Sequence, residues 1–417
     1  MTCRLDMPPG RGPRDAAPLP AALAWIDADL SAIRTADLER PVRTRSGRQG
    51  RVVEIDGRSL VNFAANDYLG YAGDVRLAKA AAKAACAEGF GAAASPLVSG
   101  HSLAHAGLEA AIASLLGVDA AVVFPSGFAA NTATIAALVG PGDFIASDDR
   151  NHASIIDGCR LSRARVGIYP HRDMAALDAA LGRESAARRR LIVTDTLFSM
   201  DGSRAPLADL SELAARHRAI LLVDEAHATG VFGARGSGLV EETGCADGVH
   251  VRVGTLSKAL GSSGGFVAGH ADLVHWLRHR ARAWMFSTAH PPAVAAAATR
   301  AIELVAAEPH RRRELLARAG QVRDALLRAG LDTGEADAQI VPVVVGPAAA
   351  AVAAAARLCE AGLFVPAIRP PSVPEGRSLL RISLSWHHTG ADLDQLTAGI
   401  RTALGAVRPD RRQEKCR

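Results

Sequence analysis

The sequence predicts an α/β fold, in which a large domain with a mostly parallel seven-stranded sheet precedes a smaller α+β C-terminal domain. The chain has 417 residues, 49% of them hydrophobic but only 4% aromatic, so it can bury a large core built mainly from aliphatic side chains and alanine. Short apolar runs alternate with helical stretches through the middle of the chain. Polar residues follow several of these runs, which is typical of sheets that bind ligands at one edge.

The first 65 residues are expected to precede the large domain. Residues 1–20 are rich in Pro, Gly and Arg and lack the apolar segment of a secretory signal, so a disordered lead is predicted there. A helix is predicted over residues 21–40 and a small β section over residues 52–63. The apolar positions that indicate the helix are Leu23, Ile26, Leu30 and Ile33.

The large domain is predicted over residues 66–290. Its strand candidates are short, and Gly, Pro or Asp residues bound them. Because helical stretches separate the candidates, they are expected to form a mostly parallel sheet that is buried on both faces. The candidates are residues 121–124, 144–147, 166–169, 191–195, 220–224, 249–254 and 265–268.

The small domain is predicted over residues 291–417, with a basic tail. Residues 340–356 are apolar enough to suggest a membrane span, but Pro342, Gly346 and Pro347 interrupt them. A strand followed by a helix is therefore expected, and no membrane association is predicted.

The formal net charge is +5, and much of the excess lies in three local basic runs. Such runs are usually solvated surface or frayed ends. The shortage of aromatic residues argues against a protein that stacks nucleic-acid bases, so no nucleic-acid partner is expected. The runs are residues 188–190, 311–313 and 408–417.

Six cysteines are spread along the chain, and none belongs to a C-x-x-C pair. This usage is typical of proteins that are kept reduced, so a cytoplasmic location is predicted. The six are Cys3, Cys86, Cys159, Cys245, Cys359 and Cys416.

Three short motifs point to other functions, but each stands in the wrong context. Residues 224–227 read D-E-A-H, as in helicases, yet the chain has no G-x-x-x-x-G-K-[ST] phosphate loop. Residues 261–265 match the G-x-S-x-G elbow of hydrolases, but a strand-like run follows where a helix is needed. A serine hydrolase built on Ser263 remains an alternative. The loose G-x-G-x-x-A at residues 89–94 follows a helical stretch rather than a strand.

The strongest chemical signal is a set of polar groups at the ends of successive strand candidates. Asp224 ends one candidate, His227 lies three residues later, and Lys258 follows the next candidate along the chain. In an open parallel sheet these ends lie at one edge, where ligands bind. The other members of the set are Ser126, Gly127, Phe128, Asn151, His152 and Ser199.

These residues suit a pyridoxal phosphate site. The cofactor needs a lysine amine for its covalent attachment and a carboxylate against its ring nitrogen. A glycine turn at a helix N-terminus binds phosphate through free N–H groups and the helix dipole. The ring also benefits from a flat neighbour and from donors near its oxygen. Lys258, Asp224, Gly127–Phe128, His152, Ser199 and His227 would fill these places.

Each of these residues has an ordinary interpretation when it is considered alone. A lysine after a strand is usually at the surface, and an aspartate there usually belongs to a turn. A single histidine is more often a hydrogen-bonded structural residue than a catalyst. Their joint occurrence at one edge of a sheet favours the functional interpretation.

Six phrases of the sequence are typical of one known family: N-D-Y-L-G (66–70), S-G-F-A-A-N (126–131), N-H-A-S (151–154), F-S-M-D-G (198–202), D-E-A-H-A-T-G (224–230) and G-T-L-S-K-A-L-G (254–261). With them the chain resembles the α-oxoamine synthases, a fold-type I branch of the pyridoxal phosphate enzymes, from about residue 29 to about residue 404. The resemblance implies a pyridoxal phosphate cofactor and a homodimer.

The resemblance also implies roles for individual residues. Lys258, Asp224 and His152 form the catalytic set: the lysine holds the cofactor, the aspartate pairs with its ring nitrogen, and the histidine stacks on its ring. The remaining cofactor contacts are Ser199 and His227 at the ring oxygen and Gly127, Phe128 and Thr255 at the phosphate. Substrate contacts are implied for Arg40, His152, Ser372 and Arg381, with Arg381 at the amino-acid carboxylate. Ser287 and Thr288 are implied to reach the phosphate site of a partner subunit.

The activity implied is a decarboxylating condensation of an amino acid with an acyl thioester. The phrases A-I-R-P-P-S-V-P (367–374) and L-R-I-S-L (380–384) favour the branch that uses L-alanine and a pimeloyl thioester, carried by coenzyme A or an acyl-carrier protein, in biotin synthesis. The phrase N-H-A-S-I-I-D-G (151–158) also fits a glycine-using branch.

Some alternatives therefore stay open. Glycine with acetyl-coenzyme A, a long-chain or secondary-metabolite acyl thioester, and a cofactor-binding module without catalysis remain possible. The family often has Thr at the position of Ser372, and a glycine-rich run where this chain has A-A-A-S-P (92–96), so acyl-chain preference is open as well.

Overall fold

The computed structural model describes residues 19–405. The chain divides into two compact units, residues 1–42 and residues 43–417. The first unit contains a 3-10 turn at Ala21–Leu23 and the helix α1 (Trp25–Thr35). The helix predicted over residues 21–40 is thus present, but it ends at Thr35. The predicted disordered lead and basic tail fall mostly on residues 1–18 and 406–417, which lie outside the described residues.

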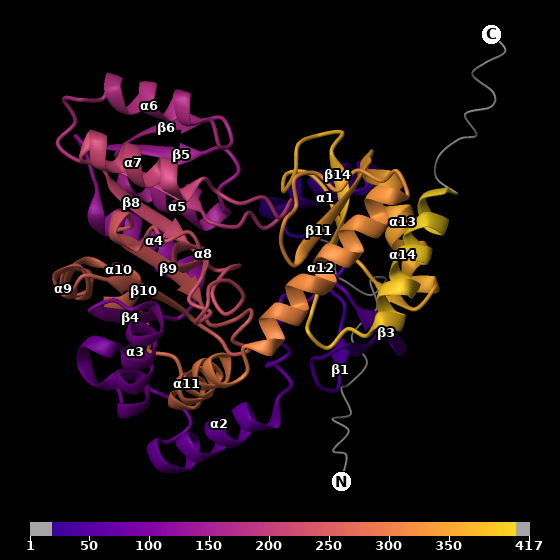
Figure 1. Ribbon diagram of the computed structural model, residues 1–417, viewed down its shortest axis with the longest axis horizontal. Coiled ribbons are helices and arrows are strands. Elements are labelled where there is room, and N and C mark those ends of the chain that lie inside the picture. Colours follow the sequence, from indigo (N-terminus) through magenta and orange to yellow (C-terminus); the bar gives the residue numbers. More distant parts are fainter. Residues whose placement is uncertain (1–18, 406–417) are drawn as a thin grey trace. The chain divides into compact units, whose positions relative to one another are not determined.

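All seven strands predicted for the large domain are present and form one sheet (Figure 1). They are β4 (Ala120–Phe124), β5 (Phe144–Asp148), β6 (Arg165–Tyr169), β7 (Arg190–Asp195), β8 (Ile220–Asp224), β9 (Val251–Thr255) and β10 (Gly265–Gly269). The strand order is β4-β10-β9-β8-β7-β5-β6. Only β10 runs against its neighbours, so the expectation of a mostly parallel sheet is confirmed.

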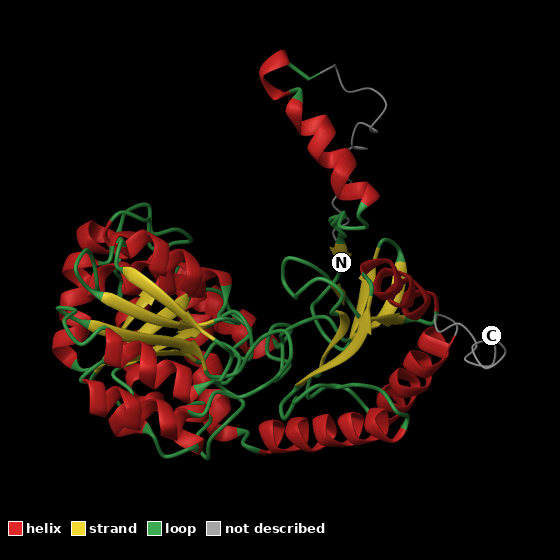
Figure 2. Cartoon of the chain, turned by 90° about the horizontal axis from the view of Figure 1, so that it is seen from above, coloured by secondary structure: helices red, strands yellow, loops and turns green. Residues whose placement is uncertain are grey.

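Helices cover both faces of this sheet (Figure 2). Successive residues of a strand point to opposite faces. Along β8, Leu221 and Val223 join one apolar cluster and Leu222 joins another, which shows that both faces are buried. The helices of this part are α2 (Val75–Glu88), α3 (Leu103–Leu116), α4 (Gly127–Leu138), α5 (Ala153–Ser162), α6 (Met174–Arg183), α7 (Leu207–His217), α8 (Leu239–Glu242), α9 (Ala271–Arg280), α10 (Arg282–Met285) and α11 (Pro292–Ala307).

Two smaller sheets accompany the large one. The first has the order β1-β2-β3-β12, with β1 (Arg45–Ser46), β2 (Val52–Ile55), β3 (Arg58–Asn62) and β12 (Leu363–Phe364). The second has the order β11-β14-β13, with β11 (Ile340–Gly346), β13 (Ala367–Ile368) and β14 (Ser378–Ser383). The helices α12 (His310–Arg328), α13 (Ala348–Glu360) and α14 (Gly390–Gly405) complete this part. The predicted β section and the predicted strand and helix within residues 340–356 are confirmed.

The domain boundary at residue 290 stays a prediction. The helix α11 packs against α2 and α3, beside the large sheet. The next helix, α12, packs against β11 and α14 instead. By these contacts, the change from the large sheet to the small α+β part comes between α11 and α12.

One of the three basic runs is not solvated surface, so that interpretation is wrong for it. Arg311 and Arg312 are each only 7% exposed. The guanidinium of Arg311 lies over the rings of Tyr71 and Trp386, at 4.6 and 4.1 Å from their centroids. Aromatic faces and backbone carbonyl groups satisfy a buried guanidinium, which composition does not reveal. Arg313 is exposed, as expected.

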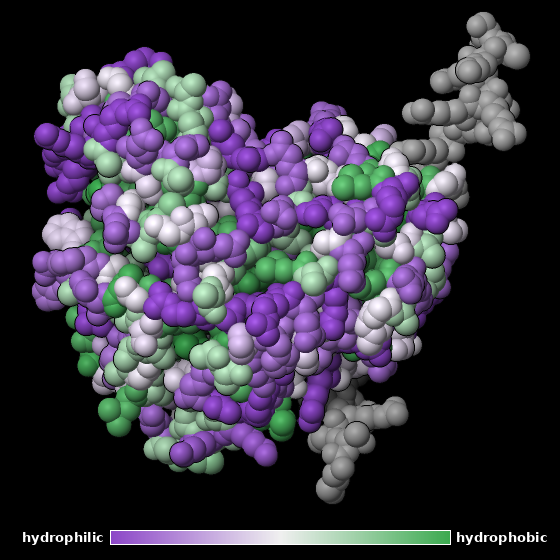
Figure 3. Space-filling view, viewed as in Figure 1, coloured by the Kyte–Doolittle hydropathy of each residue, from purple (hydrophilic) through white to green (hydrophobic). Residues whose placement is uncertain are grey.

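Hydrophilic side chains predominate on the face shown in Figure 3, with apolar ones between them. Within residues 19–405, no helix is both long and apolar enough to cross a membrane.

Candidate active site

The polar residues predicted to meet do so because the strands carrying them end at one edge of the sheet. β7, β8 and β9 are parallel, and β4 runs in the same direction because both it and β9 are antiparallel to β10. At the start of β10, Gly265 is in register with both Phe124 and Thr255, the last residues of β4 and β9. Asp195 and Asp224 end the neighbouring strands β7 and β8 in register.

Lys258 lies in the turn after β9 and faces His227. Its Nζ is 2.7 Å from His227 Nε2. Burial lowers the pKa of Lys258 to about 8, against the opposing charges of Asp224 and Asp195. His227 is 5% exposed, and burial followed by the charge of Lys258 lowers its pKa well below the usual value. The site therefore holds a neutral imidazole beside an amine that loses its proton unusually easily.

Asp224 is a buried carboxylate, 5% exposed, at the end of β8. Asn131 Nδ2 of α4 donates to its Oδ2 at 2.6 Å, and the Ala226 N–H donates to its Oδ1 at 2.8 Å. Both contacts are donated to the carboxyl oxygens, which act here as acceptors only. The residue thus meets the requirement for a carboxylate against a pyridinium nitrogen.

The N-terminus of α4 provides a place for a phosphate group. The side chain of Ser126 caps the helix by accepting from the Ala129 N–H at 3.1 Å. The N–H groups of Gly127 and Phe128 belong to the first turn, where no intrahelical acceptor exists. A Cβ at Gly265 would lie 2.5 Å from the Gly127 nitrogen, so the glycine keeps this space open. An anion fits here for the physical reason that applies to helix N-termini in general.

His152 stands at the start of α5 with its ring exposed. The backbone N–H of His152 donates to Asp195 Oδ2 at 2.8 Å, and its ring nitrogen Nδ1 lies 2.7 Å from Ser154 Oγ. The ring of Phe128 meets it edge-on, with the centroids 6.5 Å apart. These contacts fix the backbone and one ring nitrogen, and the exposed ring leaves a face for a planar ligand.

Arg381 of β14 links the small part of the chain to the same region. It is 5% exposed, and its Nε donates to the Ser199 carbonyl oxygen at 2.5 Å. Its two terminal nitrogens each lie 3.2 Å from Asn66 Oδ1. A buried guanidinium held in this way is suited to a carboxylate ligand.

Thr255 completes the cofactor set, whereas other predicted residues are not joined to it. Thr255 is 6% exposed and donates to the Gly264 carbonyl oxygen at 2.9 Å. Ser372 is exposed in the segment between β13 and β14. Arg40 belongs to the separate unit of residues 1–42, so its substrate contact stays a prediction.

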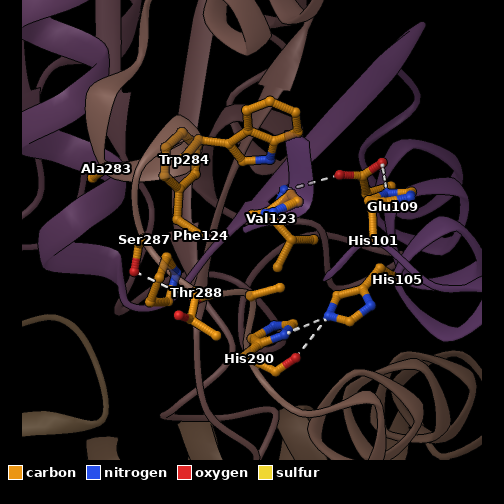
Figure 4. A pocket seen from close by; sticks show the side chains of 13 residues that line it. His101, His105, Glu109, Val123, Phe124, Ala283, Trp284, Ser287, Thr288 and His290 are labelled. Atoms are coloured by element: carbon orange, nitrogen blue, oxygen red, sulfur yellow. Dashed lines mark hydrogen bonds and ion pairs between the residues drawn. The ribbon is translucent and has the colours of Figure 1, made fainter. Parts of the chain in front are cut away.

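Ser287 and Thr288 line a different, small cavity (Figure 4). The Ser287 hydroxyl donates to the Thr288 carbonyl oxygen at 3.3 Å. On another wall, His105 Nε2 lies 3.0 Å from His290 Nδ1. Neither Ser287 nor Thr288 shares a hydrogen bond with the residues around Lys258 in the part of the chain described.

Four residues of the site were missed as individual candidates: Asn66, Tyr68, Asn131 and Asp195. Asp195 ends a predicted strand beside that of Asp224, so the strand-end argument applied evenly would have found it. Asn66, Tyr68 and Asn131 stood only inside matching phrases. Their hydrogen bonds to Arg381, His227 and Asp224 depend on tertiary structure and leave no local signal.

A hydrolase-like arrangement lies nearby but is structural. His171 Nδ1 is 3.0 Å from Asp148 Oδ1, and its Nε2 is 3.0 Å from Ser203 Oγ, the order of a Ser-His-Asp triad. However, Ser203 is 1% exposed and its hydroxyl donates to Asp201 at 2.7 Å. The hydrogen-bonded set of Asp148, His171 and Ser203 therefore anchors the turn that carries Ser199. Ser263 precedes β10 rather than a helix, which leaves the elbow motif without its required context.

The chain is similar to known proteins along most of its length. The family model described as aminotransferase class I and II matches residues 58–400. The 8-amino-7-oxononanoate synthase of Anaeromyxobacter dehalogenans is 49% identical over 389 residues, covering 93% of this chain and 96% of that protein.

Solved structures are also similar to this chain over most of its length. A serine palmitoyltransferase from S. paucimobilis, with a bound adduct of pyridoxal phosphate and myriocin, has 29% identity and a TM-score of 0.88, covering 93% of this chain and 98% of that one. An 8-amino-7-oxononanoate synthase from Francisella tularensis has 25% identity and a TM-score of 0.72, covering 83% of this chain and 98% of that one.

Proposed function

The chain belongs to the aminotransferase class I and II family, and we propose from this premise that its site condenses L-alanine with a pimeloyl thioester to form 8-amino-7-oxononanoate for biotin synthesis. The resemblance to the α-oxoamine synthases is confirmed, and the chain is a pyridoxal phosphate-dependent acyltransferase of fold type I. The observation that carries the proposal is the Lys258 amine, held 2.7 Å from the buried His227 at the sheet edge that also bears Asp224.

The reaction makes one carbon–carbon bond and breaks two bonds to leaving groups. The α-carbon of L-alanine loses its hydrogen and bonds to the thioester carbonyl carbon. The carbon–sulfur bond breaks, and the thiol leaves with a proton. The carboxylate then leaves as carbon dioxide, and a proton replaces it at the α-carbon. The site must therefore supply a base, a cation for the carboxylate and a means of accepting charge at the α-carbon.

Pyridoxal phosphate supplies an electron-accepting ring for the charge that develops at the α-carbon. Lys258 would hold the cofactor and then serve as the base. With a pKa of about 8, about a tenth of the amine is unprotonated at pH 7, far more than at the ordinary value of 10.5. The neutral His227 stays within hydrogen-bond distance of that amine.

The remaining cofactor contacts follow from the groups at the edge of the sheet. We assign Asp224 to the ring nitrogen and the exposed ring of His152 to the face of the cofactor. The ring oxygen would take Ser199 and His227, and the phosphate would take Gly127, Phe128 and Thr255. The first-turn N–H groups of α4 and the space kept by Gly265 support the phosphate assignment.

Arg381 is the cation we assign to the alanine carboxylate. Its guanidinium is buried among neutral acceptors, Asn66 Oδ1 and the Ser199 carbonyl, so its charge has no carboxylate partner among its described hydrogen bonds. A substrate carboxylate supplies that counter-charge. Arg40 and Ser372 remain proposed contacts for the substrate.

A substrate panel tests the function. L-alanine, glycine and L-serine are each combined with pimeloyl, acetyl and palmitoyl thioesters of coenzyme A, and with a pimeloyl carrier protein. Thiol release and product mass are measured. The proposal expects the mass of 8-amino-7-oxononanoate from L-alanine and a pimeloyl thioester. A preference for glycine and acetyl-coenzyme A, or for a long-chain thioester, would overturn it.

We also propose that two copies of the chain form a homodimer with shared active sites. Large apolar side chains are exposed in the two chain segments around Ala94 and Ser287, including Phe90 at 79%, Val98 at 79% and Phe286 at 65%. The Ala289 N–H bonds to the Ala94 carbonyl, which ties these two segments together. Grouped apolar exposure of this kind is typical of protein interfaces. Ser287 and Thr288 would then reach the partner's phosphate site.

Mixing two inactive variants tests this sharing. Lys258→Ala chains are combined, by unfolding and refolding together, with chains carrying Ser287→Ala and Thr288→Ala. If sites are shared across a two-fold axis, each mixed dimer regains one intact site, and about a quarter of the wild-type activity returns. No recovery in a confirmed mixed dimer would contradict shared sites.

We also propose that the protein is located in the cytoplasm. The described cysteines, Cys86, Cys159, Cys245 and Cys359, are all free thiols. Unpaired thiols are typical of a reducing compartment.

A further inference from the structure

Tyr68 reaches the ring nitrogen of His227 that does not face Lys258. Its hydroxyl oxygen lies 2.6 Å from His227 Nδ1, while Lys258 Nζ lies 2.7 Å from His227 Nε2. Tyr68 is completely buried, at 0% exposure. The imidazole therefore lies between a phenol and the amine of Lys258, with one ring nitrogen for each.

Both Tyr68 and His227 are neutral. Burial raises the pKa of Tyr68, so the phenol keeps its proton. Burial, together with the charges of Lys258 and Arg381, lowers the pKa of His227 well below its usual value. A neutral imidazole carries one hydrogen, on Nδ1 or on Nε2, and the hydrogen bond at one nitrogen decides which.

The Tyr68 hydroxyl has one hydrogen and two acceptors within reach. His227 Nδ1 lies at 2.6 Å, and Asn66 Oδ1 lies at 3.1 Å. Asn66 Oδ1 also accepts from both terminal nitrogens of Arg381 at 3.2 Å and from Ser383 Oγ at 3.4 Å, so its two lone pairs already have other donors. The shorter contact has the length typical of an O–H donor. The other donors at Asn66 Oδ1 and the shorter contact both favour Tyr68 as the donor to His227 Nδ1.

Both side chains are fixed in this arrangement. The carbonyl oxygen of Tyr68 accepts from the Trp386 N–H at 2.8 Å. On the other side, Gln339 Nε2 donates to the His227 carbonyl oxygen at 2.8 Å. The two rings meet at 48°, with their centroids 6.0 Å apart. These bonds hold the two backbones, and the burial of Tyr68 at 0% and of His227 at 5% exposure leaves the two rings little room to turn.

We propose that Tyr68 is a positioning residue that fixes His227 as the tautomer with its hydrogen on Nε2. The imidazole then presents a donor to the space beside Lys258. This inference rests on the proposed function, in which the ring oxygen of pyridoxal phosphate needs a donor at this place. The same hydrogen disfavours the ammonium form of Lys258, because an ammonium group has donors only.

Nitrogen-15 spectra of the histidine rings test this inference directly. The full chain is labelled with 15N-histidine, and the signals of His227 are identified by their loss in His227→Asn. Couplings between ring nitrogens and ring carbon-bound hydrogens distinguish the two tautomers. Spectra are recorded before and after addition of pyridoxal phosphate. At a pH above the Lys258 pKa of about 8, where the neutral amine can accept the hydrogen of Nε2, the wild type should show the Nε2–H pattern in both states.

Tyr68→Phe removes only the hydroxyl group. Since a neutral hydrogen bond of this kind is lost, the tautomer ratio should move about tenfold toward Nδ1–H. Tyr71→Phe is the matched control, because Tyr71 is equally buried but its hydroxyl bonds to Glu308 at 3.3 Å. That variant should leave the His227 signals unchanged.

Two results would overturn the inference: an Nδ1–H pattern in the wild type above the Lys258 pKa, or an unchanged His227 pattern in folded Tyr68→Phe. If Tyr68→Phe does not fold, the wild-type spectrum still decides, because it reports the tautomer itself. Failure of the proposed function is a separate result, since it would be seen as a wrong product while the tautomer in the cofactor-free chain stayed as stated.

Discussion

Asp195 and Asp224 are in-register partners at the ends of the adjacent parallel strands β7 and β8. Both are buried, at 3% and 5% exposure. Burial and the negative charge of Asp224 raise the pKa of Asp195 well above its usual value. Two neighbouring buried carboxyl groups do not both ionise easily, so we assign them different roles: Asp224, which accepts from Asn131 and Ala226, is the carboxylate of the site, and Asp195 holds its proton more readily than an ordinary aspartate.

This difference predicts that the same substitution, Asp to Asn, has a small effect on activity at position 195 and a large effect at position 224. Asp195→Asn keeps a neutral acceptor for the His152 N–H and should change kcat/KM by less than about threefold. Asp224→Asn removes the carboxylate assigned to the ring nitrogen and should lower kcat by about 10²–10³-fold. Steady-state kinetics on both variants checks the pair. Equal losses in the two would contradict the assignment.

The raised pKa of Asp195 also has a consequence for stability. Since the folded pKa exceeds the unfolded value of 3.8, the folded state holds the proton more tightly. Its contribution to stability is fully present below the unfolded pKa and is lost as the pH rises through the folded pKa. Asn does not titrate, so urea unfolding should show Asp195→Asn gaining stability relative to wild type as the pH rises. A pH-independent difference would count against the raised pKa.

The amine of Lys258 should react at an unusually low pH. In the cofactor-free chain, labelling with an amine-reactive reagent, followed by peptide mass spectrometry, should rise with a midpoint near the pKa of about 8. The same segment in a denatured chain should rise near the ordinary value of 10.5. Because the pKa of Lys258 is lower in the folded chain than in the unfolded chain, the stability that this group contributes increases as the pH rises from about 8 to 10.5. A midpoint near the ordinary value in the folded chain would refute the burial argument.

The glycine at position 265 is expected to be essential for binding the phosphate. Gly265→Ala puts a Cβ 2.5 Å from the Gly127 nitrogen, so the start of α4 must move. Affinity for pyridoxal phosphate should weaken about tenfold or more, as expected when charge-assisted hydrogen bonds are lost. Gly107→Ala in α3 is the control, because nothing lies within 4 Å of its added Cβ. Fluorescence titration compares the two, and equal affinities would contradict the phosphate site.

The guanidinium of Arg381 should act on the amino acid rather than on the cofactor. Arg381→Ala is expected to raise KM for L-alanine about 10- to 100-fold, since a bond to a charged group is lost. The affinity for pyridoxal phosphate should change little. Arg377→Ala, an exposed residue just before β14, serves as the control. An unchanged KM together with a lost cofactor would assign Arg381 a different role.

The fold was predictable because its signals are local. Each strand of the large sheet is a short apolar run with breakers at its ends, and parallel strands bring their carboxyl ends to one edge. For that reason Asp224 and Lys258 were found from the residues themselves. The same rule also covers Asp195, which ends the strand beside that of Asp224.

The rest of the site was not predictable from local pattern. Tyr68 and Asn66 come from a segment outside the large sheet, and Arg381 comes from β14 of another sheet. Arg381 was placed only through the family resemblance. Arg311 lay in a basic run, but its burial between two aromatic rings depends on residues far away in the sequence. Such contacts form only when the chain has folded, so neither spacing nor composition reveals them.

Borohydride reduction of the enzyme with bound pyridoxal phosphate tests the central claim most directly. Reduction makes the covalent link between the cofactor and its lysine permanent, and peptide mass spectrometry then locates it. The label should lie on Lys258, within residues 254–261, and the Lys258→Ala chain should carry none. A label on another residue, or none on the wild type, would contradict the site described here.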